Sequence, residues 1–589
     1  MIKASKPALR TPRADEGVQG KLPIIRYEPE DILRRQAWTD DRFGFFIHWG
    51  LSAIPAGVWQ GRPVGGLSEW IQFKARISNS AYGQLAAEFN PVDFNAREWV
   101  RMAAEAGAKY LVFTAKHHDG FAIYHSHASS FNVVDATPFA RDPLAEIAEA
   151  CAEYGLMLGL YYSQTIDWED PDAVGPQCND WDFDPAKGDF QRYWQRKAMP
   201  QLRELLGNYG DIGLLWFDMP KGIPVDCAKE ASDLVRTMQP GAVINSRLGW
   251  GAETDYQSMD DNYFNNHLPE RDWETAATTN DSWGFSDGSA GWKPVESLCE
   301  ALAYAVSRGG NFLLNVGPDA SGRIPPEAVR QFRGIGSWME RTAAGIHGSG
   351  PSPFAGTFDW GCVTTRERSI FLHVSDSACT EAVLPGLAVE PTSVIDLARR
   401  EPVSVRAVAP AGVPVGLAIA LPTPTDTLPR AVELKFAELP VVDQAITQAP
   451  GRGLRLDVWT ADAGEDGHLR WKFNMAEPGE YQVVLLSKQT HVHFNPQWWA
   501  AGQAGTLSTE SGRQDFVLGN DGEEPYPFIH YWKLVRSEIG RVVVVAPGRH
   551  ELAIEDLCVV DSKWDDSGVN LVGIRLEPIR ATEAAAQNG

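Results

Sequence analysis

The strongest constraint on the fold is an alternation of apolar, strand-like runs with amphipathic, helix-like stretches between about residues 40 and 345. Four runs, 110–115, 156–162, 212–217 and 312–316, are apolar almost throughout, which is typical of strands buried on both faces of a parallel sheet. The stretches between them end at glycine, a residue that suits a helix C-cap. Repeats over about 300 residues favour a closed (β/α)8-like barrel. An open doubly wound sheet is the alternative, although no GxGxxG motif follows an early strand, as its dinucleotide-binding form requires.

The sequence pattern changes after His347. Residues 348–440 carry short alternating runs broken by proline and glycine, which predicts a β-sandwich. After a proline-containing linker, residues 452–580 again predict strands. We therefore predict an α/β chain with a barrel over residues 1–347, followed by two all-β domains, in keeping with a length of 589 residues.

Charge and composition exclude several classes of protein. The formal net charge is −24, so nucleic acid and anionic membranes are not expected partners. The seven cysteines are scattered and never form CxxC, which argues against a zinc ribbon or a disulfide framework. The first 24 residues lack the apolar stretch of a signal peptide, so a cytoplasmic location is expected, or a periplasmic or secreted one if a leader has been removed. The sequence leaves the oligomeric state open.

The aromatic content points to sugars. The chain has 21 Trp, 15 Tyr and 25 Phe residues. Core packing accounts for about half of them, because aromatic side chains bury large apolar areas. The flat rings of the others match the apolar C–H faces of pyranoses.

Polar side chains gather where the apolar runs end. In a β/α barrel these ends meet at one mouth, where such enzymes place their catalytic groups. The polar and aromatic residues in these positions are His48, Trp49, Lys116, His117, His118, Asp119, Tyr161, Tyr162, Trp216, Asp218 and Arg247.

Asp218 follows five apolar residues, and a carboxylate buried there without a role would be costly. The structural alternative is that Asp218 caps the next helix. Arg247 could supply the counter-charge of Asp218 or bind a substrate hydroxyl. Adjacent histidines on an extended backbone point to opposite sides, so His117 and His118 are poor candidates for ligating one metal ion. No GxSxG motif supports a serine nucleophile. We expect no metal and no cofactor, and neutral histidines that hydrogen-bond to sugar hydroxyls.

Eight motifs in fixed order then resemble the glycoside hydrolase family 29 α-L-fucosidases over residues 35 to 345: FGFFIHWG, SEW, AGAKYLVFTAKHHDGF, GLYYS, LWFD, NSR, WGF and SRGGNFLLNVGPDASGRIPPE. The resemblance implies a retaining exo-hydrolase that removes terminal α-L-fucosyl groups from fucosylated oligosaccharides or glycoconjugates by double displacement, with Asp218 as nucleophile. It also implies that the fucose ring is held by His48, Glu69, Trp70, His117, His118, Tyr161, Trp216, Arg247 and Trp283. Glycine usually follows this Asp in the family, whereas Met219 and Pro220 follow it here.

A retaining glycosidase also needs a general acid/base, with its carboxyl group about 5–5.5 Å from the nucleophile. The resemblance places this acid on a variable loop between NSR and WGF, which contains Glu270 and Glu274. We predict Glu274, because the preceding Trp273 could exclude water and raise the carboxyl pKa. Glu69 in SEW is the other candidate, although we assign it to sugar hydroxyls.

Three other functions stay open at this stage: an α-L-galactosidase of the same fold, a non-catalytic protein that binds fucosylated glycans, and a metallohydrolase. The domain over residues 452–580 is either a separable glycan-binding module or a buttress for the barrel. The aromatic residues that motivate glycan binding are Trp459, Trp471, Trp498, Trp499, Trp532 and Trp564.

Overall fold

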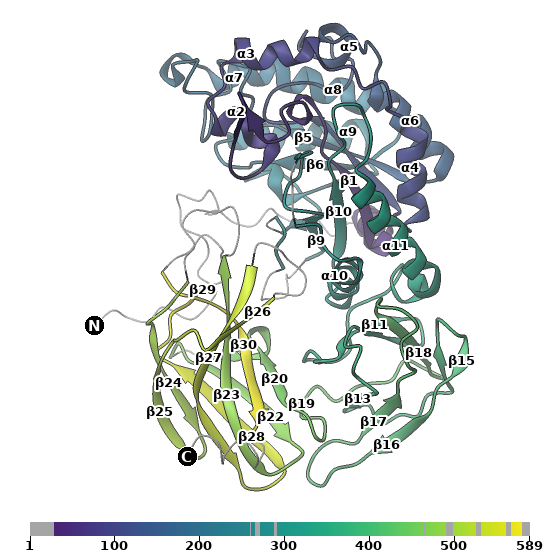
Figure 1. Ribbon diagram of the computed structural model, residues 1–589, viewed down its shortest axis with the longest axis vertical. Helices are drawn as coiled ribbons and strands as arrows, with labels where there is room; N and C mark the ends of the chain where they lie inside the picture. Colours follow the sequence, from purple (N-terminus) through teal and green to yellow (C-terminus); the bar gives the residue numbers. More distant parts are fainter. Residues whose placement is uncertain are drawn as a thin grey trace.

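The computed structural model describes residues 29–259, 261–264, 271–287, 291–464, 466–490, 499–525, 532–560 and 567–579. Figure 1 shows the barrel in purple to teal, with two β-rich parts, green and yellow-green, lying side by side beneath it. Glu270, Trp498 and Trp564 lie outside the described residues, as does the side chain of Trp532.

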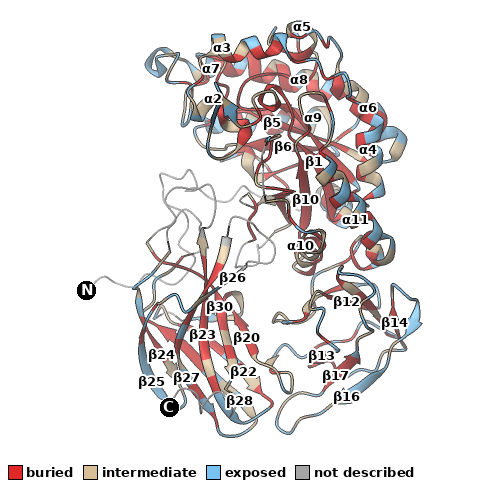
Figure 2. Cartoon of the chain, viewed as in Figure 1, coloured by how far each residue is buried: buried red, intermediate tan, exposed pale blue. Residues whose placement is uncertain are grey.

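Eight parallel strands form the barrel, as predicted. Their order around the sheet is β7-β6-β5-β4-β1-β10-β9-β8, and an isolated parallel bridge between Asn245 and Tyr256 joins the two outermost strands. Their bounds are β1 Phe43–Ile47, β4 Tyr110–Lys116, β5 Met157–Ser163, β6 Ile212–Asp218, β7 Val243–Ile244, β8 Gln257–Ser258, β9 Trp273–Thr278 and β10 Asn311–Val316. Almost every residue of the longer strands is buried (Figure 2), which explains their continuous apolar runs.

Helices cover the outside of the barrel. The longer ones are α1 Pro29–Asp41, α4 Ala96–Glu105, α6 Pro143–Tyr154, α8 Met199–Asn208, α9 Val225–Met238, α10 Val295–Ser307 and α11 Pro326–Thr342. Helix α6 shows how the local sequence sets its limits: Asp142 caps its first turn by accepting a hydrogen bond from the Ala145 amide, and Gly155 ends it at φ 70°. It turns Leu144, Ile147 and Cys151 toward the strands, at the spacing of one helical face.

The barrel is irregular between β7 and β9. Strands β7 and β8 have two residues each, and the described residues between β7 and β9 include only the short 3-10 helix η7, Ser246–Leu248, besides β8. This stretch is therefore mostly loop, and it lies beside the carboxyl end of β6.

Two β-rich parts follow the barrel. The first has a five-stranded and a three-stranded sheet, formed by β11 Gly361–Arg366, β12 Ser369–Val374, β13 Glu381–Pro385, β14 Ser393–Asp396, β15 Glu401–Pro402, β16 Val405–Val408, β17 Gly416–Ala420 and β18 Arg430–Lys435. The second, here called the C-terminal sandwich, has two six-stranded sheets, formed by β19 Ile446–Thr447, β20 Leu454–Asp457, β21 Asp462–Ala463, β22 Leu469–Met475, β23 Gly479–Thr490, β24 Ala504–Thr509, β25 Gly512–Val517, β26 Gly522–Pro525, β27 Trp532–Val544, β28 Gly548–Glu555, β29 Val559–Val560 and β30 Val569–Pro578.

The C-terminal sandwich has its own core and also packs on the barrel. Trp471 is completely buried in that core and donates a hydrogen bond to the Asp457 carbonyl, so it is a packing residue and does not bind glycan. The guanidinium of Arg308, next to α10, lies 3.7 Å from the ring centroid of Trp459 and occupies a face of that ring. Four residues of β23, β27 and β30 belong to the same apolar cluster as the barrel: Val484, Leu486, Leu534 and Val572.

A cavity of about 710 Å³ lies where the three parts meet, lined by Tyr304 of α10, by Trp360 and by Trp459 among others. None of its lining residues belongs to the ends of the barrel strands. The cavity is therefore separate from the mouth at which the predicted site residues lie. Within the described residues, no helix combines the length and apolar character needed to cross a membrane.

Candidate active site

The structure brings the polar strand ends together at the barrel mouth. The His48 and His117 rings, after β1 and β4, have centroids 5.7 Å apart. The His117 ring stacks on Tyr161 of β5 at 5.5 Å and 12°. Tyr161 in turn donates a hydrogen bond of 2.8 Å to Asp218, the last residue of β6. Residues far apart in the chain thus form one continuous surface.

Asp218 is held from several directions. Its Oδ2 accepts the hydrogen bond from Tyr161, and its Oδ1 accepts from Arg247 at 3.0 Å and from the Met219 amide at 2.8 Å. The Nε2 of His118 lies 3.6 Å from Oδ2. The Asp218 side chain remains 13% exposed, so the hydrogen bonds fix its orientation without sealing it off from the mouth.

The loop after Asp218 keeps a conformation that suits glycine. Met219 has φ 56°, in the left-handed region, where a residue with a Cβ is strained by about 1–2 kcal/mol. This is the position at which glycine is usual in the family that the motifs resemble. Met219 therefore replaces that glycine by tolerating the strain.

His48 and His118 each present an unprotonated nitrogen to the mouth. Asn315 donates its amide to the Trp283 carbonyl, so its Oδ1 accepts from Nδ1 of His48, at 2.7 Å. The Ser163 hydroxyl donates to the Ile166 carbonyl and so accepts from Nδ1 of His118, also at 2.7 Å. In both rings Nε2 is then the hydrogen-bond acceptor.

Burial keeps these histidines neutral. It lowers the pKa of His48 and of His118 to about 4, and the pKa of His117 well below its usual value. At neutral pH the barrel mouth therefore holds uncharged imidazoles, which can accept hydrogen bonds.

Glu69 adds a further acceptor. It lies in the 3-10 helix η3, Ser68–Trp70, and its Oε2 accepts hydrogen bonds from the Gly284 amide and the Ser282 hydroxyl. Its Oε1 is buried and has no hydrogen-bond partner among the residues that the structure describes. A buried acceptor without a partner costs free energy unless a ligand donates a hydrogen bond to it. Burial also raises the pKa of Glu69.

Aromatic rings lie around these polar groups at the barrel mouth. Trp70 contacts the His118 ring edge-on at 4.9 Å, and Trp283 lies 5.2 Å from the His48 ring. Trp216 lies under the Arg247 guanidinium, 4.7 Å from it. All nine side chains predicted to hold the sugar thus lie in this mouth or in contact with its members.

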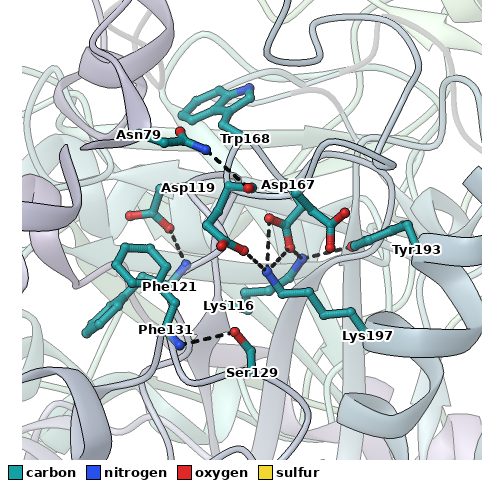
Figure 3. A network of polar contacts seen from close by, with 12 residues as sticks. Asn79, Lys116, Asp119, Phe121, Ser129, Phe131, Asp167, Trp168, Tyr193 and Lys197 are labelled. Atoms are coloured by element: carbon teal, nitrogen blue, oxygen red, sulfur yellow. Dashed lines mark hydrogen bonds and ion pairs between the residues drawn. The ribbon is translucent and has the colours of Figure 1, made fainter. Parts of the chain in front are cut away.

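Lys116 also ends a strand, but it belongs to a separate buried ion cluster. It is completely buried, and its Nζ donates to Asp167 at 2.9 Å and to the Tyr193 hydroxyl at 3.0 Å (Figure 3). Lys197 reaches the same Asp167 carboxylate at 3.0 Å. Next to Asp167, the Trp168 amide donates to the His118 carbonyl, so this buried ion cluster ties the loop after β5 to the end of β4.

Glu274 is not on a loop across from Asp218, and that expectation is wrong. It is the second residue of β9 and pairs with Asn311, the first residue of β10, whereas Asp218 is the last residue of its strand. Its side chain is fully buried inside the barrel. Its carboxylate accepts hydrogen bonds from Tyr110, Trp216 and Tyr256, which hold it beneath the Trp216 ring.

The sequence reasoning missed Asp261. The Nη2 of Arg247 donates to Asp261 at 2.6 Å, while Nη1 binds Asp218, so one guanidinium bridges both carboxylates. The Asp261 side chain is 32% exposed. It follows the two-residue strand β8, which is too short to show an apolar run in the sequence. Asp218 was predicted because it ends such a run, and Asp261 does not.

No group of three or more His, Cys, Asp or Glu side chains is arranged to hold a metal ion, as far as the described part of the chain goes.

Comparison with known proteins finds α-L-fucosidases. The family model described as Alpha-L-fucosidase matches residues 26–344. Rat tissue α-L-fucosidase is 29% identical over 387 residues, which are 61% of this chain and 79% of the rat protein.

Two solved structures are similar over long stretches. The α-L-fucosidase from Vibrio sp. strain EJY3 is 34% identical with a TM-score of 0.87, covering 94% of this chain and 98% of that one. The α-L-fucosidase AlfC from Lactobacillus casei, solved with α-L-fucose product, is 41% identical with a TM-score of 0.50, covering 52% and 98%.

The buried Glu274 predicts a pH dependence of stability. Desolvation raises its pKa from 4.5 to about 7, so the folded protein binds a proton that the unfolded chain releases between these values. Stability is therefore fully present below about pH 4.5 and is lost as pH rises through 7. We expect the free energy of unfolding of wild type, relative to Glu274→Gln, to fall by up to about 3 kcal/mol between pH 4.5 and 8.

Urea unfolding at several pH values measures this difference. The exposed Glu149 of α6 offers a matched control, because Glu149→Gln should leave the pH dependence unchanged. If Glu274→Gln and wild type lose stability in parallel, the carboxyl group is not protonated in the folded protein near neutral pH.

Proposed function

This chain belongs to the α-L-fucosidase family and is a retaining glycoside hydrolase that acts on terminal α-L-fucosyl linkages, and we propose that Asp218 is its nucleophile. The observation that carries the proposal is the position of this carboxylate at the end of β6, in the barrel mouth, with its orientation fixed by Tyr161 and Arg247. Attack on the anomeric carbon would give a covalent fucosyl-enzyme, which water then hydrolyses.

The side chains around Asp218 offer hydrogen-bonding groups and rings that suit a sugar. Nε2 of His48, Nε2 of His118 and Oε1 of Glu69 are acceptors, and each sugar hydroxyl can donate to one of them. Arg247 supplies donors of fixed geometry, and Trp70 and Trp283 offer apolar rings to the C–H faces of the sugar. We assign these residues, together with His117, Tyr161 and Trp216, to binding the fucose ring.

We propose Asp261 as the general acid/base in place of Glu274. A general acid has to reach the glycosidic oxygen, which points out of the mouth toward the leaving group. Asp261 is partly exposed and shares Arg247 with the nucleophile, whereas Glu274 is sealed inside the barrel by three hydrogen bonds. Glu69 is the second candidate, but its Oε2 is occupied by the Gly284 amide and the Ser282 hydroxyl.

Asp218→Gly should fold normally and lose several orders of magnitude of kcat, as when other covalent catalysts are removed. Added azide should restore turnover and give β-fucosyl azide, because the small anion fits the vacated face and attacks with inversion. Product stereochemistry by NMR distinguishes this from simple hydrolysis. Asp211→Gly, at the exposed start of the same strand, is the matched control. Near-wild-type activity of Asp218→Gly would refute the assignment.

Asp261→Asn tests the acid, because asparagine can still accept from Arg247 but carries no transferable proton. A general acid is worth roughly 10²–10⁴-fold with a poor leaving group and little with dinitrophenolate, which departs without a proton. We expect kcat/KM to fall by about that factor on a fucosylated glycan and to stay near wild type on dinitrophenyl fucoside. Azide should then give the retained α-fucosyl azide.

The same pair of substrates separates the other candidates. Glu274→Ala should slow both substrates to a similar extent, because it disturbs Trp216 beneath Arg247. If instead Glu69→Ala or Glu274→Ala shows the selective loss and the azide product, and Asp261→Asn does not, that residue is the acid.

A further inference from the structure

The C-terminal sandwich contacts the barrel immediately after Asp261. Lys488 of β23 is 2% exposed, and its Nζ donates a hydrogen bond of 2.7 Å to the Phe264 carbonyl. The same ammonium lies 4.1 Å from the centroid of the Tyr263 ring, within the range of a cation–π interaction. A buried ammonium is costly unless it is compensated, and here two of the compensating contacts come from residues two and three positions beyond Asp261.

A second contact from the sandwich reaches the same segment. Asn570 of β30, which is 1% exposed, donates its side-chain amide to the Tyr263 hydroxyl at 3.4 Å. Tyr263 and Phe264 are themselves completely or almost completely buried. The four apolar side chains of the sandwich that join the barrel core come from β23, β30 and their neighbour β27. This part of the sandwich therefore packs against the barrel through both apolar and polar contacts.

The barrel holds the segment from its other side. Asn262 adopts a left-handed conformation with φ 49°, which asparagine tolerates better than most residues. Its Oδ1 accepts hydrogen bonds from the Thr278 amide and from Nζ of the buried Lys293, both at 2.9 Å, and its backbone N–H donates to the Ala276 carbonyl. The backbone that carries Asp261 is thus fixed between β9 and the C-terminal sandwich.

We propose that the C-terminal sandwich positions the general acid/base, with Lys488 as a positioning residue that acts through the Tyr263–Phe264 segment. The inference rests on the role proposed above for Asp261. Proton transfer to the leaving oxygen requires hydrogen-bond geometry, and displacements near 1 Å cost rate. Asp218 lies at the end of β6, outside the Tyr263–Phe264 segment that the sandwich contacts. The position of the nucleophile should therefore not depend on Lys488.

The test is Lys488→Met, which keeps most of the side-chain volume and removes the donor. The readout is kcat/KM on dinitrophenyl fucoside and on a fucosylated glycan, because this ratio reports the glycosylation step and excludes deglycosylation. We expect a loss of about tenfold or more on the glycan and little change on the dinitrophenyl substrate, as for a displaced acid. Lys488→Arg, which can donate to the same carbonyl, should recover part of the loss.

Lys472→Met is the matched control, since Lys472 lies exposed on β22 of the same sandwich and should show neither effect. Unchanged kcat/KM on both substrates, or an equal loss on both, would overturn the proposal, because a merely structural residue produces no such selectivity. If Lys488→Met does not fold, Asn570→Val removes a second contact from the sandwich to Tyr263 and leaves the Lys488 ammonium in place, and the same selective loss is expected of it.

Measuring Asp261→Asn alongside the sandwich variants tells a failure of the positioning role from a failure of the acid assignment. If Asp261→Asn shows the selective loss and the sandwich variants do not, the positioning role is wrong and the acid assignment stands. If Asp261→Asn slows both substrates equally, the acid assignment fails and the positioning proposal fails with it.

Discussion

The geometry of the mouth depends on one guanidinium. Arg247 binds Asp218 through Nη1 and Asp261 through Nη2, and its plane lies over Trp216. Two carboxylates that must work close together repel each other, and a shared cation offsets this repulsion while fixing their spacing. Trp216 is held in turn by the Glu274 carboxylate below it. Glu274 therefore supports the site from inside the barrel.

The fold supplies this arrangement with two kinds of support. The buried cluster of Lys116, Lys197 and Asp167 (Figure 3) joins the ends of β4 and β5. The hydrogen bond from the Trp168 amide to the His118 carbonyl connects this cluster to the histidines. Beside Asp261, the support comes from the C-terminal sandwich. Among the described residues, Oε1 of Glu69 is left as an acceptor without a partner. Side chains fixed by hydrogen bonds, together with this unmet acceptor, describe a site preorganised for a ligand rich in hydroxyl groups.

The sequence predicted the parts of the site that follow long apolar strands. His48, His117, Tyr161 and Asp218 all end or follow such runs, and the barrel topology alone brings them together. It failed at β8 and β9. Strand β8 has two residues, and β9 reads WETAAT, in which the polar Glu274 looks like part of a loop although every residue is buried. The hydrogen-bond donors to Glu274 are Tyr110, Trp216 and Tyr256, which only the closed barrel brings near it. The contact between Lys488 and Phe264 joins residues 224 positions apart in the chain, so the sequence pattern could not predict it.

The central claim, that Asp218 forms the covalent bond to fucose, can be tested by trapping that species. An α-L-fucosyl fluoride carrying fluorine at C2 has a good leaving group but a destabilised oxocarbenium-like transition state, so the fucosyl-enzyme should accumulate. Mass spectrometry of the intact protein should then show the addition of one fluorofucosyl group, and peptide mapping should place it on Asp218. A label on Asp261, Glu69 or any other residue, or normal turnover of the fluoride by Asp218→Gly, would contradict the account.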